Sequence, residues 1–190
     1  MKSRILSINK KFLYDELKNF EVLLIPGFQG INNKGELTTL GRGGSDTSAV
    51  AVAAAMETEC IIYTDVEGVF TTDPNIVPKA KKINKISYEE MLELASQGAK
   101  VLQTRSVELA MRKNTKLSVR SSFKPKKIGT MITDEKSVLE NNTVSGITYS
   151  KDEAKITLSR VQDKPGVSSK IFGPLAKGNI NVDMILQNLS

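Results

Sequence analysis

The apolar positions along the chain predict strands that alternate with helices. Continuous apolar runs at residues 21–25 and 60–63 are short and end at turn-forming residues, a pattern typical of buried strands. Between them, the alanine- and valine-rich stretch 47–57 predicts a helix whose backbone a neighbouring element can approach closely. Short strands are expected at 117–120 and 130–132. This alternation predicts an α/β layer with a parallel-type sheet.

Local signals indicate where the helices begin and end. Ser45 or Asp46 is expected to cap the helix at 47–57. Ser87 and Glu90 have the spacing of a capping box, which opens a helix that ends near Gly98. Other expected elements are a short helix at 12–17, a hairpin or loop at 31–40 that turns at 33–35, and a helix at 101–112.

The chain divides into two regions. Residues 133–143 are rich in Asp, Glu, Lys and Asn, which predicts a linker between a first domain at 1–132 and a second region at 144–190. The second region is expected to follow a β-α-β order. Its predicted elements are an alternating, half-buried strand at 155–159, a turn at 163–166, a helix at 167–177 and a strand at 179–186.

Composition and charge narrow the functional classes. The chain has no histidine and one cysteine, which excludes histidine-based triads and metal sites built from histidines or clustered thiolates. The net charge of +6 includes lysine clusters at 79–85 and 124–127, but aromatic residues make up only 5% of the chain. Because no aromatic residues alternate with the lysines, we do not expect a nucleic-acid interface. We expect either lysines exposed to solvent or a protein that binds phosphorylated ligands. Neither a membrane span nor a disulfide framework is expected, which favours the cytoplasm.

The first candidate site is the glycine-rich segment Leu40–Asp46, which leads into the helix predicted at 47–57. Free amides at a helix N-terminus bind anions, and Arg42 adds a planar fork that matches a carboxylate or phosphate. The segment is neither a P-loop nor a dinucleotide fingerprint, because no Gly-Lys-Ser/Thr follows and Asp46 replaces the third glycine. The alternative is an ordinary glycine-rich turn that Ser45 caps.

Two further candidate segments lie downstream. Thr64 and Asp65 place a hydroxyl and a carboxylate at the end of a predicted buried strand, where α/β sheets bind ligands. The alternative is that Asp65 and Asp73 only close turns through their own backbone. Lys100 follows a helix end and can deliver a positive charge to a phosphate, whereas a lone lysine is usually solvated.

Together these motifs resemble aspartate kinases of the amino-acid kinase superfamily over nearly the whole chain. The matching segments are Ile25–Gly30, Leu40–Asp46, Tyr63–Pro74, Gly98–Leu102 and Arg120–Thr130. Residues 163–166 and 181–188 resemble the first ACT regulatory module of the lysine- and threonine-controlled enzymes. The resemblance implies an α/β amino-acid-kinase (carbamate-kinase-like) nucleotide-binding half, followed by a partial ferredoxin-like α+β ACT module.

The resemblance also implies a reaction and a role for each matched residue. ATP, with Mg, would transfer its γ-phosphoryl group to the side-chain carboxylate of L-aspartate, at the start of lysine, threonine and methionine biosynthesis. A carboxylate is already ionised and needs no general base, which agrees with the absence of histidine. The implied aspartate-binding residues are Arg42, Gly43, Gly44 and Ser45, the implied catalytic residues are Asp46 and Lys100, and the implied ATP contacts are Thr64, Asp65, Phe70, Asp73, Asn75, Lys100 and Val101.

Two departures from the family pattern change the expectation. Asn75 stands where the family usually has arginine, which removes one charge from the implied nucleotide site. The family's N-terminal Lys-Phe-Gly-Gly-Thr-Ser segment is absent, and the ACT-like region stops after β-α-β. We therefore expect a fragment that is inactive alone and that associates with itself or with a chain carrying the N-terminal half. The alternatives are a non-catalytic remnant that binds nucleotide or effector, and a related amino-acid kinase with another acceptor.

The second region also offers a candidate site for an amino-acid effector such as lysine or threonine. Asp163 can hold the ammonium group, and Gly166 with the following helix N-terminus can hold the carboxylate. The other expected contacts are Val167, Ser168, Asn181, Asp183 and Gln187. Because half of the module is absent, the strand at 155–159 is expected to keep an unpaired edge, through which residues 144–190 self-associate.

Overall fold

The structure, a computed structural model, describes residues 3–134, 144–149, 154–162, 164–182 and 185–186. These residues form two compact units, 1–151 and 152–190, which we describe separately. In the described part of the chain, no helix is long and apolar enough to cross a membrane.

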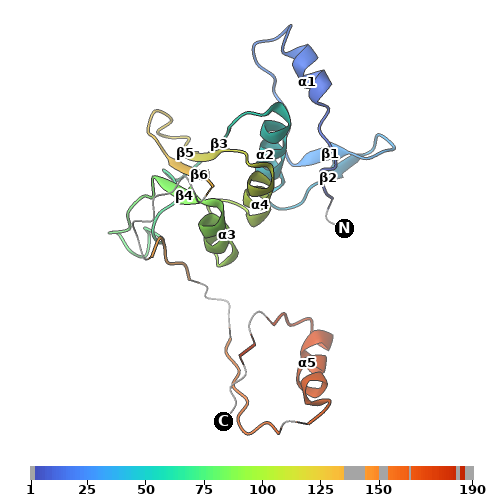
Figure 1. The fold of residues 1–190 in the computed structure, drawn as a ribbon, viewed down its shortest axis with the longest axis vertical. Helices are drawn as coiled ribbons and strands as arrows, with labels where there is room; N and C mark the ends of the chain where they lie inside the picture. The colour runs from blue at the N-terminus through green and yellow to red at the C-terminus, as the bar shows by residue number, and fades with distance from the viewer. Residues whose placement is uncertain (1–2, 135–143, 150–153, 163, 183–184, 187–190) are drawn as a thin grey trace. The chain divides into compact units, whose positions relative to one another are not determined.

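The first unit is organised around a four-stranded mixed sheet (Figure 1). Its strands, in spatial order, are β3 (Cys60–Thr64), β5 (Leu117–Ser121), β6 (Thr130–Thr133) and β4 (Lys85–Ser87). β3 runs parallel to β5 and β4 runs parallel to β6, but β5 and β6 are antiparallel. The three strands predicted from apolar runs at 60–63, 117–120 and 130–132 are confirmed. The predicted parallel-type sheet is present in the β3–β5 and β4–β6 pairs, whereas β5 and β6 are antiparallel because the loop at 122–129 is too short for a parallel crossover.

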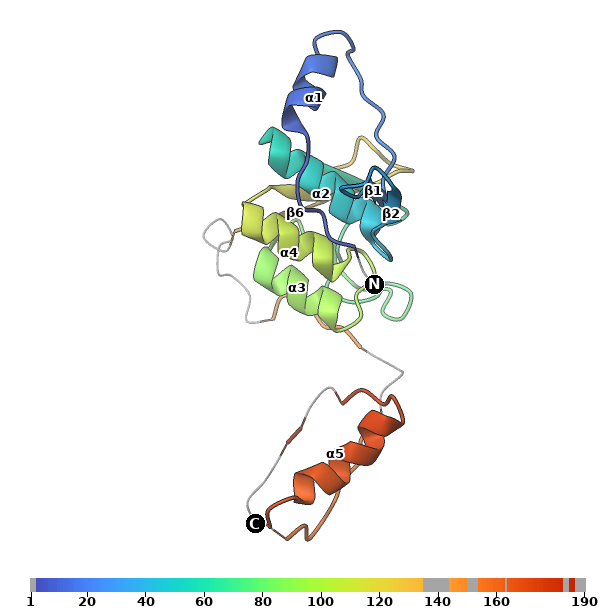
Figure 2. The same ribbon diagram turned by 90° about the vertical axis from the view of Figure 1, so that its right-hand side faces the viewer.

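Three helices pack against this sheet. Figure 2 shows α2 (Gly44–Met56), α4 (Thr104–Lys113) and α3 (Tyr88–Ser96) side by side, with α4 in contact with both of the others. α2 also contacts β3, and α3 contacts β4 and β6. The core between the helices and the strands is apolar, and its fully buried members include Val50, Ile86, Met91, Val107, Leu117, Val119 and Ile132.

The helix ends confirm one predicted cap and correct another. At α3 the capping box is present, because Ser87 Oγ accepts from the Glu90 amide at 3.1 Å and the Ser87 amide donates to Glu90 Oε2 at 3.0 Å. At α2 the N-cap is Gly43 in the left-handed region, with φ 73°, and no side chain caps the helix. The predicted caps Ser45 and Asp46 therefore lie inside the first turn, because a left-handed glycine lets the helix start earlier.

The start of α4 differs from the prediction, whereas the turn of the predicted hairpin is confirmed. α4 begins at Thr104 instead of residue 101, because Gln103 is still extended. The hairpin of β1 (Gln29–Ile31) and β2 (Leu37–Thr39) confirms the turn at 33–35, where Gly35 has φ 78°.

The N-terminal segment contains one confirmed helix and one wrong prediction. α1 (Lys10–Glu16) lies where a short helix was expected, and a Lys10–Glu57 ion pair of 2.6 Å attaches it to the end of α2. Residues 21–25 are not a strand, and the Leu24 side chain is 97% exposed. An apolar run becomes a buried strand only when other strands pair with its backbone. Within the described residues, none does.

Among the described residues of the second unit, 167–177 form the helix α5 (Val167–Lys177), which confirms the helix predicted at 167–177. The strands predicted at 155–159 and 179–186 are wrong for the residues that the structure describes there, which have no strand assignment. None of the described side chains in this unit is buried. A segment with an alternating sequence forms a strand only when one of its faces is buried or its backbone pairs with another strand.

Candidate functional site

The glycine-rich segment forms a tight turn at the N-terminus of α2. Gly41 and Gly43 both have left-handed backbones, with φ 76° and 73°. Gly44 is buried, and Phe28 and Leu40 pack directly against it, so these two residues support the turn from inside the fold. The arrangement leaves the first amides of α2 at the end of a thirteen-residue helix, where the helix dipole favours an anion.

Asp46 links this turn to the segment that carries Lys100. The Asp46 carboxylate accepts hydrogen bonds from the Gln103 backbone amide and from the Ser45 side chain. Burial raises the pKa of Asp46 above its ordinary value, and these hydrogen bonds only partly oppose that effect. The Gln103 side chain packs over Gly43, where a Cβ atom would lie 2.2 Å from Gln103 Cγ. Two sequence motifs about sixty residues apart are therefore in contact.

Arg105 supports the same turn and was not predicted from the sequence. Its guanidinium donates to the Leu40 carbonyl at 2.9 Å and to the Ser3 carbonyl at 2.7 Å. On the other side, Gly27 lies against Ser45, and the Leu40 amide donates to the Phe28 carbonyl at 2.8 Å. No local pattern marks Arg105 or Gln103, because both act through a loop distant in sequence.

Thr64 and Asp65 lie at the carboxyl end of β3, as predicted. Thr64 Oγ1 donates to Asp65 Oδ1 at 3.1 Å, and the Ser122 amide and hydroxyl both donate to the Thr64 carbonyl, at 2.8 and 2.9 Å. The Asp65 side chain is exposed at this edge. Because β3 and β5 are parallel, their carboxyl ends meet here, which is the usual ligand edge of an α/β sheet.

The segment after Asp65 is anchored to β6 by Thr130. The Val69 amide donates to the buried Thr130 hydroxyl at 2.8 Å, and that hydroxyl also contacts the Ile83 carbonyl. Phe70, half-buried, forms an isolated antiparallel bridge with Lys82.

Asp73 has the turn-closing geometry that the alternative hypothesis expected. Its Oδ1 accepts from the Asn75 amide at 2.9 Å, and its carbonyl accepts from the Val77 amide, also at 2.9 Å. Asn75 itself is exposed. The proposed ATP contact of Asp73 therefore rests on the resemblance alone.

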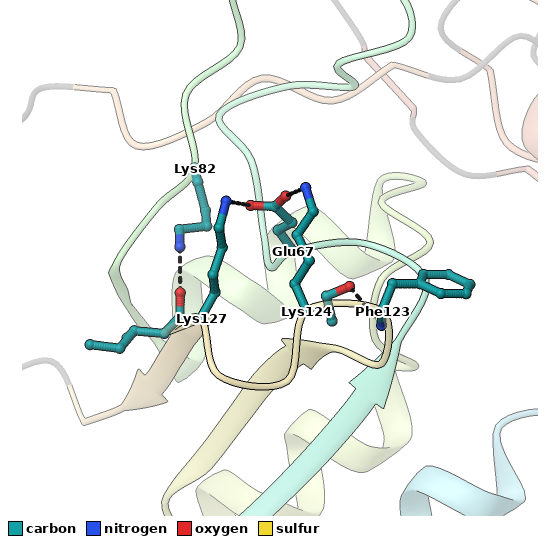
Figure 3. Close-up of polar contacts among 7 residues, drawn as sticks. Glu67, Lys82, Phe123, Lys124 and Lys127 are labelled. Atoms are coloured by element: carbon teal, nitrogen blue, oxygen red, sulfur yellow. Dashed lines mark hydrogen bonds and ion pairs between the residues drawn. The ribbon is translucent and has the colours of Figure 1, made fainter.

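A cluster of lysines surrounds Glu67 at the same edge (Figure 3). The Glu67 carboxylate pairs with Lys124, and with Lys127 at 3.6 Å, while Lys82 donates to the Ile128 carbonyl. The Lys124 hydrogen bond holds the pKa of Glu67 below its ordinary value. One carboxylate thus draws the β5–β6 loop against the turn that follows β3, and part of the lysine excess is neutralised locally.

Two cations near these loops have no partner. In the part of the chain that the structure describes, the exposed side chains of Arg42 and Lys100 make no hydrogen bond or ion pair. Val101, next to Lys100, is half-buried. The structure brings Asp46 and the glycine turn to the Lys100 segment, but no contact joins Lys100 to Asp65 or Asp73.

Cys60, at the start of β3, is buried and has no chemical role here. Burial, with a smaller contribution from the Asp46 carboxylate, raises the pKa of its thiol to about 11. A protonated, inaccessible thiol is a poor nucleophile. This agrees with the expectation that Cys60 is an apolar strand residue.

The predicted effector site is only partly described. Asp163, Asp183 and Gln187 lie outside the described residues. Gly166, with φ 89°, is the N-cap of α5, and Val167 and Ser168 follow in its first turn. Asn181 is exposed. The free helix N-terminus that a carboxylate needs is present, and the other expected contacts stay predictions.

Comparison with known proteins identifies the family. The model of the amino acid kinase family matches residues 1–121, and an ACT domain model matches residues 159–190. An aspartate kinase of Pseudomonas putida is 53% identical over 191 residues, which cover 100% of this chain and 46% of that protein. The chain belongs to the amino acid kinase family, and it spans about half the length of the curated relatives that it matches.

Two solved structures of E. coli aspartokinase III resemble the chain. The complex with lysine and aspartate has a TM-score of 0.63 and 34% identity, covering 85% of this chain and 37% of that one. The complex with aspartate and ADP has a TM-score of 0.57 and 33% identity, covering 85% and 36%.

Proposed function

We propose that this member of the amino acid kinase family forms part of an aspartate kinase, in which it supplies the nucleotide edge and part of the aspartate site. The relatives over its whole length are aspartate kinases, and a similar solved structure holds aspartate and ADP. Because the chain spans under half of those relatives, the activity is proposed for the whole protein.

One observation carries this proposal more than any other. The glycine turn at the start of α2 touches the Lys100 segment through Gln103, so anion-binding amides and the unpaired cations Arg42 and Lys100 belong to neighbouring loops. Two anions, a carboxylate and a polyphosphate, must approach each other for phosphoryl transfer, and neighbouring cations offset their repulsion. The residues present fit such a pair of ligands.

The reaction requires the protein to position the two substrates and to neutralise their negative charge. An oxygen of the aspartate side-chain carboxylate forms a bond to the γ-phosphorus of ATP, and the bond from that phosphorus to the β-phosphate oxygen breaks. The products are 4-phospho-L-aspartate and ADP, and no proton moves to or from the nucleophile. In this assignment Arg42 and the amides at Gly43, Gly44 and Ser45 hold aspartate.

The remaining assignments complete the proposed site. Lys100 neutralises phosphate charge, Asp46 orients the turn, and Thr64, Asp65 and Phe70 contact the nucleotide. Mg²⁺, when bound with ATP, neutralises phosphate charge. We also assign the 152–190 region to an amino-acid effector. Lysine is the first candidate, because a similar structure was solved with lysine bound.

Calorimetric titration of ATP and ADP into the 190-residue chain tests the nucleotide assignment. Lys100→Ala is expected to weaken binding by about 10- to 100-fold, the usual effect of losing a hydrogen bond to a charged group. Lys116→Ala is the matched control, because it also removes an exposed lysine but lies before β5, at the opposite end of the strand. Equal affinities for the two variants would contradict the role of Lys100.

A second titration tests the acceptor. Arg42→Ala should weaken L-aspartate binding more than ATP binding. The reverse ranking, or ATP binding without any response to L-aspartate in the longer protein, would favour a kinase with a different acceptor.

A further inference from the structure

Phe123 presents an exposed aromatic ring at the ligand edge of the sheet. It follows the last residue of β5 by two positions, and its side chain is 78% exposed, more than that of any other aromatic residue that the structure describes. The preceding residue, Ser122, donates twice to the Thr64 carbonyl, at 2.8 and 2.9 Å. Because Thr64 and Asp65 are proposed nucleotide contacts, Phe123 is one residue away from a direct contact with that site.

The backbone is held in place on both sides of Phe123. Its own amide donates at 3.2 Å to the hydroxyl of Ser121, a buried residue. On the other side, Lys124 pairs with Glu67, and the Lys124 carbonyl accepts from the Lys127 amide at 3.0 Å. A single exposed apolar residue needs no explanation by itself, but a ring on a fixed backbone can take up a ligand at a low entropic cost.

The loop that carries this ring also carries positive charge. Lys124, Lys126 and Lys127 follow Phe123, and within the described residues their ion pairs all go to the Glu67 carboxylate. Figure 3 shows the Phe123 ring pointing away from Glu67 and from the two lysines that pair with it. The loop at 122–129 therefore offers a flat apolar surface and, apart from it, an excess of positive charge.

These two surfaces match the two chemical parts of a nucleotide. A base is planar and stacks on an aromatic side chain, whereas a phosphate chain is attracted to lysines. Phe70, the aromatic residue already assigned to the nucleotide, is half-buried, and its backbone forms a bridge with Lys82. Phe123 has more of its ring free for a planar ligand. A purely apolar partner could use the same ring but would gain nothing from the lysines beside it.

We propose that Phe123 stacks on the adenine base of ATP and makes the site prefer a nucleotide over an inorganic polyphosphate. The proposal rests on the proposed nucleotide function, and it adds a contact from the β5–β6 loop to the residues assigned there. The lysines of this loop contribute charge alone, which favours any polyphosphate. The ring is the part of the loop that distinguishes a ligand with a base from one without.

Calorimetric titrations of ATP and of inorganic tripolyphosphate into the 190-residue chain test this proposal. Phe123→Ala should raise the Kd for ATP about 5- to 100-fold, the usual effect of losing one stacked base. The Kd for tripolyphosphate should stay within about twofold, because that ligand has no base. Phe123→Tyr keeps the ring and should bind ATP like the parent. Ile128→Ala is the matched control, because Ile128 is 80% exposed in the same loop.

Fluorescence gives a second readout, because the chain contains no tryptophan. In Phe123→Trp, ATP should quench the emission of the introduced indole ring, and tripolyphosphate should not. In Ile128→Trp, neither ligand should change the emission. This comparison separates a base that stacks at residue 123 from a general change in the loop.

Three outcomes would contradict the stacking. An unchanged Kd for ATP in Phe123→Ala overturns it while leaving the proposed function in place. An equal loss of ATP and tripolyphosphate binding in that variant also overturns it, because the ring would then act only on the shape of the loop. A parent chain that binds neither ligand contradicts the proposed function itself, and the stacking with it.

Discussion

Gly41 and Gly43 share one backbone conformation but differ in their surroundings. Both have φ near 75°, yet a Cβ on Gly41 meets nothing within 4 Å, whereas one on Gly43 overlaps the Gln103 side chain. Gly41→Ala should therefore cost only the left-handed strain, about 1 kcal/mol. Gly43→Ala adds overpacking and should cost about 2–4 kcal/mol in the free energy of unfolding.

Urea denaturation of the two alanine variants measures this difference. Equal costs at Gly41 and Gly43 would show that Gln103 does not pack over the turn. Because that contact also positions the amide that Asp46 accepts from, Gly43→Ala is the variant expected to weaken aspartate binding.

The lowered pKa of Glu90 predicts a contribution to the free energy of unfolding that depends on pH and comes from this one residue. Burial opposes its ionisation, but hydrogen bonds from Ser145 and Ser87 favour the carboxylate and lower its pKa below the ordinary value. A carboxyl group with a lowered native pKa stabilises the fold above its unfolded pKa, and this contribution is lost as pH falls through the native pKa.

We therefore expect Glu90→Gln to lower the free energy of unfolding by about 1 kcal/mol at pH 7, since the group is largely solvent-screened. The difference from the parent should vanish in acid, below the native pKa of Glu90. Glu89→Gln is the matched control, because it removes a charge from the same helix turn but leaves the Ser145–Glu90 hydrogen bond in place. A deficit that is the same at all pH values would contradict this assignment.

At the scale of elements, Thr130 ties the turn after β3 to β6. Its buried hydroxyl accepts from the Val69 amide and contacts the Ile83 carbonyl. Thr130→Val leaves that amide without a partner and should cost about 1–3 kcal/mol, whereas Thr130→Ser keeps the hydroxyl and should recover most of the stability. Thermal unfolding of the pair tests this, and equal loss in both variants would mean that only the methyl group matters.

The elements also show which parts of the fold can be predicted from the sequence. The capping box at Ser87 and the apolar runs of β3, β5 and β6 are local signals, and all of them are confirmed. The same kind of run at 21–25 failed, because burial of a strand depends on partners that its own residues do not encode. The three-residue strand β4 gave no signal at all, since three residues do not establish a period.

The candidate site divides in a similar way. The glycine turn and the end of β3 could be found from residue type and position, because amides at a helix start and side chains at a strand end have general roles. The contacts of Gln103 with Gly43 and of Arg105 with Leu40 could not, because they join loops about sixty residues apart. Only the packing of α4 beside α2 brings them together.

At the scale of the whole molecule, the described residues of the second unit include no buried side chain. The side chains of Ile156, Leu158, Ile180 and Val182 are exposed by 73%, 54%, 58% and 44%. Several exposed apolar side chains in one unit are the kind of surface that binds a partner when they form one patch. A second copy offers the same unpaired segments, so pairing between two copies buries apolar surface on both.

We therefore expect the 190-residue chain to self-associate through residues 144–190, with an apparent mass by light scattering that rises with concentration. Ile156→Asp and Ile180→Asp should each shift the chain toward monomer, because a charge at either position opposes burial. Leu6→Asp is the matched control: Leu6 is 87% exposed but lies in the first unit, so its substitution should leave association unchanged. A strictly monomeric parent chain, or an equal response to all three substitutions, would show that this surface is covered by something other than a second copy.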